Sequence, residues 1–177
     1  MAQPVLGNKM RTVAHVTHEA VYKSGGIGSV LEGLLTSGPY RAADLRTILI
    51  GPLFPGGDAD SRLGEGGEVF YSSLDGVARN QQVADALNHV RREFHIEIVY
   101  GHRPIVNLYD GRHATVEVVL IGVDRMSLEK TNTFKAGLWE TYGIDSRQYE
   151  NSYEYDLYVK LAQPALVELL AQLGLPD

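Results

Sequence analysis

Apolar and polar positions change their spacing several times along the chain, and the first changes mark three consecutive elements. Residues 11–17, RTVAHVT, favour β-branched side chains and predict a strand. The strand runs into the loop HEAVYKSGG at 18–26. Beyond that loop, apolar residues recur at helical spacing until the SGP triplet at 37–39 ends the pattern; they are Ile27, Val30, Leu31, Leu34 and Leu35. We therefore expect a strand, a glycine-rich loop and a helix.

Short apolar segments predict further strands along the chain. They lie at 47–51 (TILIG) and 95–100 (HIEIVY). A third segment, TVEVVLIGV at 115–123, is apolar almost throughout, which is typical of a central strand covered on both faces. Asp110 and Gly111 predict a turn before it.

Two longer segments have helical spacing. One spans residues 80–94, and the other runs from Tyr149 to Gly174. We expect a kink at Pro164 inside the second helix, because proline removes a backbone donor and clashes with the preceding turn. The glycine-rich stretch at 55–67 predicts a long surface loop.

Strands that alternate with helices predict an α/β fold with a doubly wound, mostly parallel sheet and helices on both faces. Such sheets bind ligands beyond the carboxyl ends of their strands, where loop 18–26 is expected to lie. We expect residues 1–177 to form a single Rossmann-like domain. Because the sequence ends at LGLPD, where another strand would be expected to begin, we also expect this domain to be a fragment of a larger protein.

Composition narrows the possible functions. The 177 residues are 44% hydrophobic and 21% charged, which suits one globular domain. With 16 Lys and Arg against 22 Asp and Glu, the formal charge of -6 argues against binding to nucleic acid or to an anionic membrane. The chain has no cysteine, so it offers neither a disulfide nor a thiolate ligand or nucleophile. No leader or membrane-spanning segment is recognisable, and we expect a soluble, cytoplasmic protein.

Several familiar motifs fail to match. The dinucleotide pattern G-x-G-x-x-G, started at Gly26, would need glycine where Leu31 stands. His18 and Glu19 begin like the zinc motif H-E-x-x-H, but Tyr22 occupies the second ligand position. We therefore expect neither a metal nor a cofactor. The remaining histidines and the acidic residues of the glycine-rich stretch also lack ligand spacing; they are His15, His89, His95, His102, His113, Asp58, Asp60 and Glu65.

The loop itself carries the candidate chemistry. Lys23 stands two residues before Gly25 and Gly26, which places a positive charge beside backbone amides that a ligand can approach closely. This arrangement suits phosphate binding; the alternative is a turn with an exposed lysine. Glu19 could orient Lys23 or accept hydrogen bonds from a sugar hydroxyl, and it could equally be a solvated charge.

Three segments resemble one family in the same order along the chain. HEAVYKSGGIGSV at 18–30 resembles the amino-terminal signature of glycogen and starch synthases, in which an acidic residue precedes a Lys-x-Gly-Gly loop. The IGP triplet at 50–52 and FKAGLWETYGID at 134–145 resemble segments of the eukaryotic-type glycogen synthases. VYGHRPI at 99–105 is loosely similar to a Gly-Arg segment of that family, and no role is transferred to His102 or Arg103.

This resemblance implies the amino-terminal half of a GT-B glycosyltransferase, whose active site lies between two Rossmann-like domains. The implied enzyme transfers glucose, with retention, from a nucleotide-diphosphate glucose to an α-1,4-glucan. Lys23 would be catalytic at the departing phosphate, and Glu19, Gly25 and Gly26 would help to bind the substrate. The carboxyl-terminal domain would hold the nucleotide, so this chain alone is expected to be inactive. Bacterial synthases commonly have aspartate where Ser29 stands, which leaves ADP-glucose and UDP-glucose both open as donors.

Other interpretations remain. The acceptor could differ, as in sucrose- or trehalose-type synthases, or the chain could be a non-catalytic binding module. A flavodoxin-like domain would purify as a yellow protein. For Trp139 and Tyr142 we expect core packing, because aromatic residues beside Leu138 at helical spacing usually face inward. The alternative is a stacking surface for glucan rings.

Overall fold

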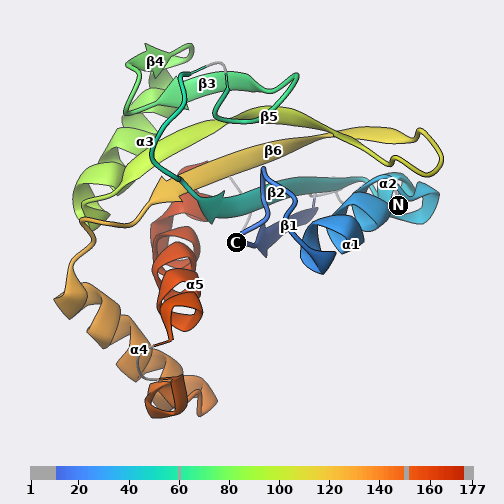
Figure 1. Ribbon diagram of the computed structural model, residues 1–177. Coiled ribbons are helices and arrows are strands. Elements are labelled where there is room, and N and C mark those ends of the chain that lie inside the picture. Colours follow the sequence, from blue (N-terminus) through green and yellow to red (C-terminus); the bar gives the residue numbers. More distant parts are fainter. Residues whose placement is uncertain (1–10, 60, 150–151, 174–177) are drawn as a thin grey trace, which may run out of the picture.

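The computed structural model describes residues 11–59, 61–149 and 152–173. It has an α/β fold in which six strands form one mixed sheet in the order β1-β2-β6-β5-β3-β4 (Figure 1). Three neighbouring strands are parallel: β1 (Arg11–Val16), β2 (Leu45–Pro52) and β6 (His113–Gly122). The other three run antiparallel to their neighbours: β5 (Glu97–Val106), β3 (Glu68–Ser72) and β4 (Val77–Ala78).

The expectation of a mostly parallel sheet is therefore wrong. Two strand pairings are parallel and three are antiparallel. For β5 and β6 the reason is their short connection, residues 107–112, since parallel neighbours need a crossover of about a dozen residues or more. The expected turn is present there, with Gly111 at a φ of 71° and its N–H donating to the carbonyl of Asn107 at 2.8 Å.

The helices follow the sequence pattern closely in two places. α1 spans Gly26–Leu35, and α3 spans Gln81–Phe94. The side-chain oxygen of Asn80 accepts from the N–H of Val83 at 3.1 Å and so caps the start of α3. The SGP triplet ends α1 as expected, but Ser37 also begins the short helix α2 (Gly38–Ala42).

The carboxyl-terminal helical region has an irregular middle. α5 (Tyr153–Pro164) is followed by a π-helical segment η2 (Ala165–Leu169) and by α6 (Leu170–Gln172). The irregularity expected at Pro164 thus takes the form of a π-helical turn, in which the hydrogen-bond pattern changes directly after the proline. Residues 150–151 and 174, where this helix was also expected, lie outside the described residues.

Apolar side chains cover both faces of the sheet. Alternate residues of β2 point to opposite faces, with Ile48 and Ile50 in one buried cluster and Leu49 in the other. α3 and α5 pack on the first face. α1 packs on the second face through Leu35, together with the loop that follows β1.

One expectation about the core is wrong. α4 (Leu128–Tyr142) stands away from the sheet and lies beside α5 (Figure 1). Trp139 is 55% exposed and Tyr142 is 72% exposed. Thr131 is the one buried residue of α4. Apolar and polar residues are mixed around this helix, so no single face is apolar enough to draw both aromatic rings inward. The η1 turn (Ser146–Tyr149) follows α4.

The predicted surface loop at 55–67 connects β2 to β3, although Leu63 within it is fully buried. Among the described residues, no helix combines the length and apolar character needed to cross a membrane.

Candidate functional site

The loop at 18–26 begins at the carboxyl end of β1, as the sequence predicts. The N–H of Thr17 still bonds to the carbonyl of Ile50 at 2.8 Å, so the loop leaves the sheet directly afterwards. It then crosses close over β2: a Cβ added at Gly51 would lie 2.5 Å from the Cβ of Ala20 and 2.9 Å from the carbonyl oxygen of Thr17. Gly51 of the IGP triplet is therefore required because the loop packs on its backbone.

Glu19 is buried and binds the start of α1. Its side chain is 3% exposed, and its Oε2 accepts a hydrogen bond from the N–H of Gly28 at 2.7 Å. Burial by itself raises the pKa of Glu19, but hydrogen bonds from the backbone of Gly28, Gly25 and Ser24 more than offset this, so the pKa lies below its ordinary value. An ionised carboxylate at this end of a helix also stabilises the helix dipole. Glu19 thus acts as a cap for α1.

The three glycines at the start of α1 differ in what surrounds them. A Cβ at Gly28 would lie 2.5 Å from Oε2 of Glu19 and 2.9 Å from Cγ of Lys23. At Gly25 the nearest atom would be Oε1 of Glu19 at 3.0 Å, and at Gly26 no atom would lie within 4 Å. A side chain at Gly28 would therefore displace the carboxylate of Glu19 and the stem of Lys23, a constraint that the sequence reasoning missed. The spacing of Gly28 from Gly26, G-x-G, was the available signal.

Lys23 projects along α1. Its side chain is 43% exposed, and its Nζ lies 3.0 Å from Oε2 of Glu32. The hydrogen bond from Lys23 is the main reason why the pKa of Glu32 lies below its ordinary value. Oε1 of Glu32 also accepts from the N–H of Leu108 in the β5–β6 turn at 3.3 Å. The charge of the partly exposed Lys23 is thus engaged by a largely buried carboxylate of the same chain.

Arg103, to which the sequence assigned no role, contacts the same loop. Its Nη1 donates to the carbonyl of Ala20 at 2.9 Å and to the carbonyl of Val21. Burial of the guanidinium lowers the pKa of Arg103. The sequence offered only a weak signal for this contact, because Arg103 lies more than eighty residues after Ala20 and Val21.

His18 connects the loop to α5, which packs on the opposite face of the sheet. Its Nδ1 lies 2.6 Å from the hydroxyl oxygen of Tyr158 in α5, and its Nε2 lies 3.5 Å from Oε1 of Glu19. The loop is therefore attached to β5 through Arg103, to α1 through Glu19 and Lys23, and to α5 through His18.

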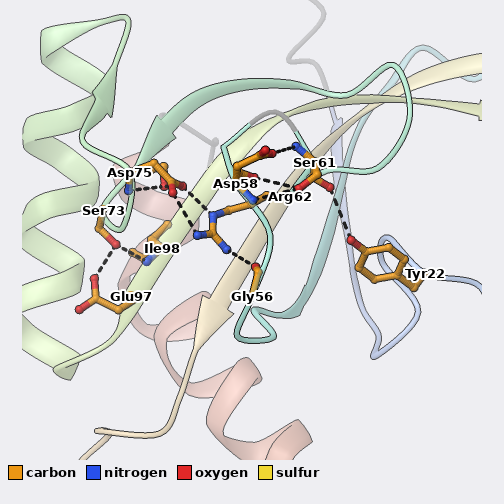
Figure 2. Close-up of polar contacts among 10 residues, drawn as sticks. Tyr22, Gly56, Asp58, Ser61, Arg62, Ser73, Asp75, Glu97 and Ile98 are labelled. Carbon is orange, nitrogen blue, oxygen red and sulfur yellow. Dashed lines mark hydrogen bonds and ion pairs between the residues drawn. The ribbon is translucent and has the colours of Figure 1, made fainter.

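A cavity of about 210 Å³ lies between this loop and the segment that follows β2. The wall formed by the segment after β2 is held by polar contacts, which Figure 2 shows. Arg62 binds the carboxylate of Asp75 at 2.6 and 3.0 Å, and its Nη1 donates to the carbonyl of Gly56 at 2.9 Å. The hydroxyl of Tyr22 lies 3.5 Å from the carbonyl oxygen of Ser61 (Figure 2). Two loops thus enclose a hollow beyond the carboxyl ends of β1 and β2.

A second cavity, of about 580 Å³, lies on the other side of loop 18–26, against α1 and β5. Glu19, Lys23, Glu32 and Arg103 line it. The loop therefore separates two hollows, and Lys23 belongs to the larger one. No group of three or more His, Asp or Glu side chains suited to a metal ion occurs within the part of the chain that the structure describes.

The four residues singled out from the sequence thus lie together at the start of α1. Glu19 and Lys23 both have partners in the chain, whereas the space around Gly26 is open. Such a site can hold an anion if Lys23 exchanges Glu32 for it. Scans of known family models and of curated proteins find no match to this sequence. The resemblance to glycogen and starch synthases therefore rests on the motifs of the chain alone.

Proposed function

We propose that this chain is the amino-terminal, doubly wound Rossmann-like domain of a retaining glucosyltransferase of the glycogen and starch synthase type. The observation that carries the proposal is the placement of the Lys-x-Gly-Gly loop beyond the carboxyl ends of parallel strands, with open space around Gly26. Ligands of α/β sheets bind at this edge. The donor would be a nucleotide-diphosphate glucose and the acceptor an α-1,4-glucan.

In this proposal, Lys23 stabilises the departing diphosphate. As the glycosidic bond breaks, negative charge grows on the phosphate oxygens, and the ammonium of Lys23 would leave Glu32 to neutralise it. The N–H of Gly26 would approach the phosphate where a side chain would block it, whereas the N–H of Gly25 already bonds to Glu19. Preorganised donors of this kind contribute about 3 to 4 kcal/mol, so loss of Lys23 should lower turnover roughly a hundredfold.

The contacts of Glu19 exclude a solvated charge and favour a role in holding the loop over a role in binding a sugar hydroxyl. Its carboxylate is buried against the start of α1 and accepts from the N–H of Gly28 at 2.7 Å. We therefore propose that Glu19 holds the shape of the loop, and that the glucose hydroxyls are bound by other groups. The partner domain would supply the nucleotide pocket, and closure of the two domains would exclude water from the cleft.

The test is transfer of labelled glucose to glycogen by the full-length protein that contains this chain. ADP-glucose and UDP-glucose are offered in parallel, and Lys23→Ala is compared with Lys130→Ala, which removes an ion pair with Glu93 instead. We expect transfer from one donor, a loss of roughly a hundredfold in Lys23→Ala and little change in the control. Transfer that survives Lys23→Ala would refute the role of the loop. Transfer to sucrose- or trehalose-type acceptors alone would change the acceptor class.

One observation favours a second candidate, a non-catalytic binding module. The start of α1 is already capped by Glu19, and Lys23 is already paired with Glu32, so the loop is stable without a ligand. Absence of transfer from either donor, together with measurable binding of a nucleotide sugar, would favour this module.

A further inference from the structure

Arg103 differs from other arginines of the chain in the partners of its charge. Six of them form ion pairs with carboxylates: Arg46, Arg62, Arg79, Arg91, Arg112 and Arg147. Within the described residues, Arg103 has no carboxylate at ion-pair distance, and its Nε is buried without a hydrogen-bond partner. A buried charge without an opposite charge is costly to the folded state. Packing alone therefore does not account for an arginine at this position.

The groups that Arg103 does contact belong to the candidate site. Its Nη1 donates to the carbonyls of Ala20 and Val21, two consecutive buried residues of the loop. On its other side, a Cβ added at Gly64 would lie 3.8 Å from Nη2. The guanidinium thus lies between the two loops that follow β1 and β2. Because Val21 is two residues before Lys23, this contact limits where the lysine can reach.

We propose that Arg103 is a positioning residue: it fixes the backbone before Lys23 and adds a positive charge that no carboxylate of the described residues pairs with, so that the loop holds an anion. The positioning is a property of the chain itself, whereas its consequence for glucosyl transfer rests on the proposed function. The carbonyls of Ala20 and Val21 accept hydrogen bonds and cannot donate one to an anion. Arg103 therefore acts on the ligand in two ways, by fixing the backbone of the loop and by its positive charge.

The first test measures the loop without any ligand. Trypsin cleavage after Lys23 is followed by mass spectrometry under native conditions in wild type, Arg103→Met and Arg103→Lys. Arg112→Met is the matched control, because Arg112 pairs with Asp110 in the exposed β5–β6 turn. We expect cleavage after Lys23 to become about tenfold faster in Arg103→Met, to change less in Arg103→Lys and to stay constant in the control. Cleavage after Lys130 serves as the internal reference.

Two results would overturn the positioning role. One is an unchanged rate of cleavage after Lys23 in Arg103→Met. The other is an equal acceleration after Lys23 and Lys130, which would mean that the variant loosens the whole fold. Arg103→Lys keeps the positive charge, so it still tests the positioning role if Arg103→Met folds poorly.

The second test measures the charge. Calorimetry gives the Kd of the chain for pyrophosphate, and we expect it to rise about tenfold in Arg103→Met, to recover partly in Arg103→Lys and to be unchanged in Arg112→Met. An equal Kd in wild type and Arg103→Met would overturn the contribution of the charge. If the wild-type chain bound no pyrophosphate, the contribution of the charge would fail, whereas glucosyl transfer by the full-length protein would still decide the proposed function and the cleavage rates would still decide whether Arg103 positions the loop.

Discussion

Glu19 and Glu117 are both largely buried carboxylates, and they are held by different kinds of donor. Glu117, in β6, accepts from Nε and Nη2 of Arg46 at 2.7 and 2.8 Å and from the hydroxyl of Tyr100 at 2.9 Å. Arg46 also donates to the carbonyl of Leu173 at 3.1 Å and so connects β2 to the end of α6. Glu19 instead accepts chiefly from backbone N–H groups of one helix end.

The two carboxylates therefore have different roles. Glu117 belongs to a structural cross-link of the sheet, whereas Glu19 lies beside Lys23, which can exchange its partner for a ligand in the proposed site. The side chains around Glu117 bind one another and come from three neighbouring strands, so the network stabilises the sheet. Glu19 fixes the backbone of the loop, and the nearby Lys23 is 43% exposed, about twice as exposed as Arg46 at 22%. Substitutions should therefore affect stability most around Glu117 and ligand binding most around Glu19.

The largest effect on stability is expected from Glu117→Ala. This change leaves Arg46 largely buried without its partner and should lower the free energy of unfolding by about 3 kcal/mol. Urea denaturation measures the loss. The double variant Arg46→Met with Glu117→Met removes both charges and should lose less than the two single variants together. A loss below about 1 kcal/mol in Glu117→Ala would place this pair among ordinary surface ion pairs.

Gly28→Ala should be the most disruptive change near Glu19. The added methyl group would lie 2.5 Å from Oε2 of Glu19, so we expect a loss of about 1 to 3 kcal/mol in the free energy of unfolding. Gly26→Ala is the matched control, since no atom lies within 4 Å of its Cβ position. Urea denaturation compares the two. Equal losses would show that Glu19 moves away easily and does not fix the loop.

Alkaline pH should weaken the Glu117 network specifically. Burial, reinforced by the nearby carboxylate of Glu117, raises the pKa of Tyr100 to about 12. Because this folded-state pKa lies above the ordinary value of 10.0, the stabilisation is complete below pH 10 and is lost as the pH rises towards 12. Thermal midpoints between pH 8 and 11 should fall less steeply in Tyr100→Phe than in wild type. If the thermal midpoint fell equally steeply with pH in both proteins, Tyr100 would not be the origin of the alkaline loss of stability.

The smallest effect is expected from Glu32→Gln. This variant frees the partly exposed Lys23 from its ion pair, so the Kd for pyrophosphate should fall by a factor of about 2 to 5 with little change in the thermal midpoint. Calorimetry checks the Kd, and Glu93→Gln, which frees Lys130, is the control. A higher Kd in Glu32→Gln than in wild type would mean that Glu32 helps to place Lys23 for its ligand.

Local signals account for what the sequence predicted correctly. β1, the loop and α1 follow one another, so the change from β-branched residues to glycines and then to helical spacing was sufficient. The antiparallel pairing of β5 with β6 was missed, because the predicted strands at 95–100 and 115–123 left residues 101–114 between them, enough for a parallel crossover, whereas both strands extend further in the structure. The short strands β3 and β4, beside the glycine-rich stretch, were missed because so few residues show no clear period.

Contacts between distant segments could not be predicted in the same way. Arg103 meets Ala20 across 83 positions, and His18 meets Tyr158 across 140, and no spacing in the sequence relates these pairs. The error at Trp139 and Tyr142 has a related cause. Their neighbours form a helix, as expected, but the sequence does not say whether another element covers that helix.

The attachment of loop 18–26 at several points has a kinetic consequence. Arg103, Glu19 and His18 hold the loop, so in the proposed anion site exchange of the ligand would require only rotation of the Lys23 side chain away from Glu32. Rotations of exposed side chains take picoseconds to nanoseconds, whereas loop rearrangements extend to microseconds. Capture of an anion by this domain should therefore proceed at the rate of diffusional encounter, without a slow conformational phase.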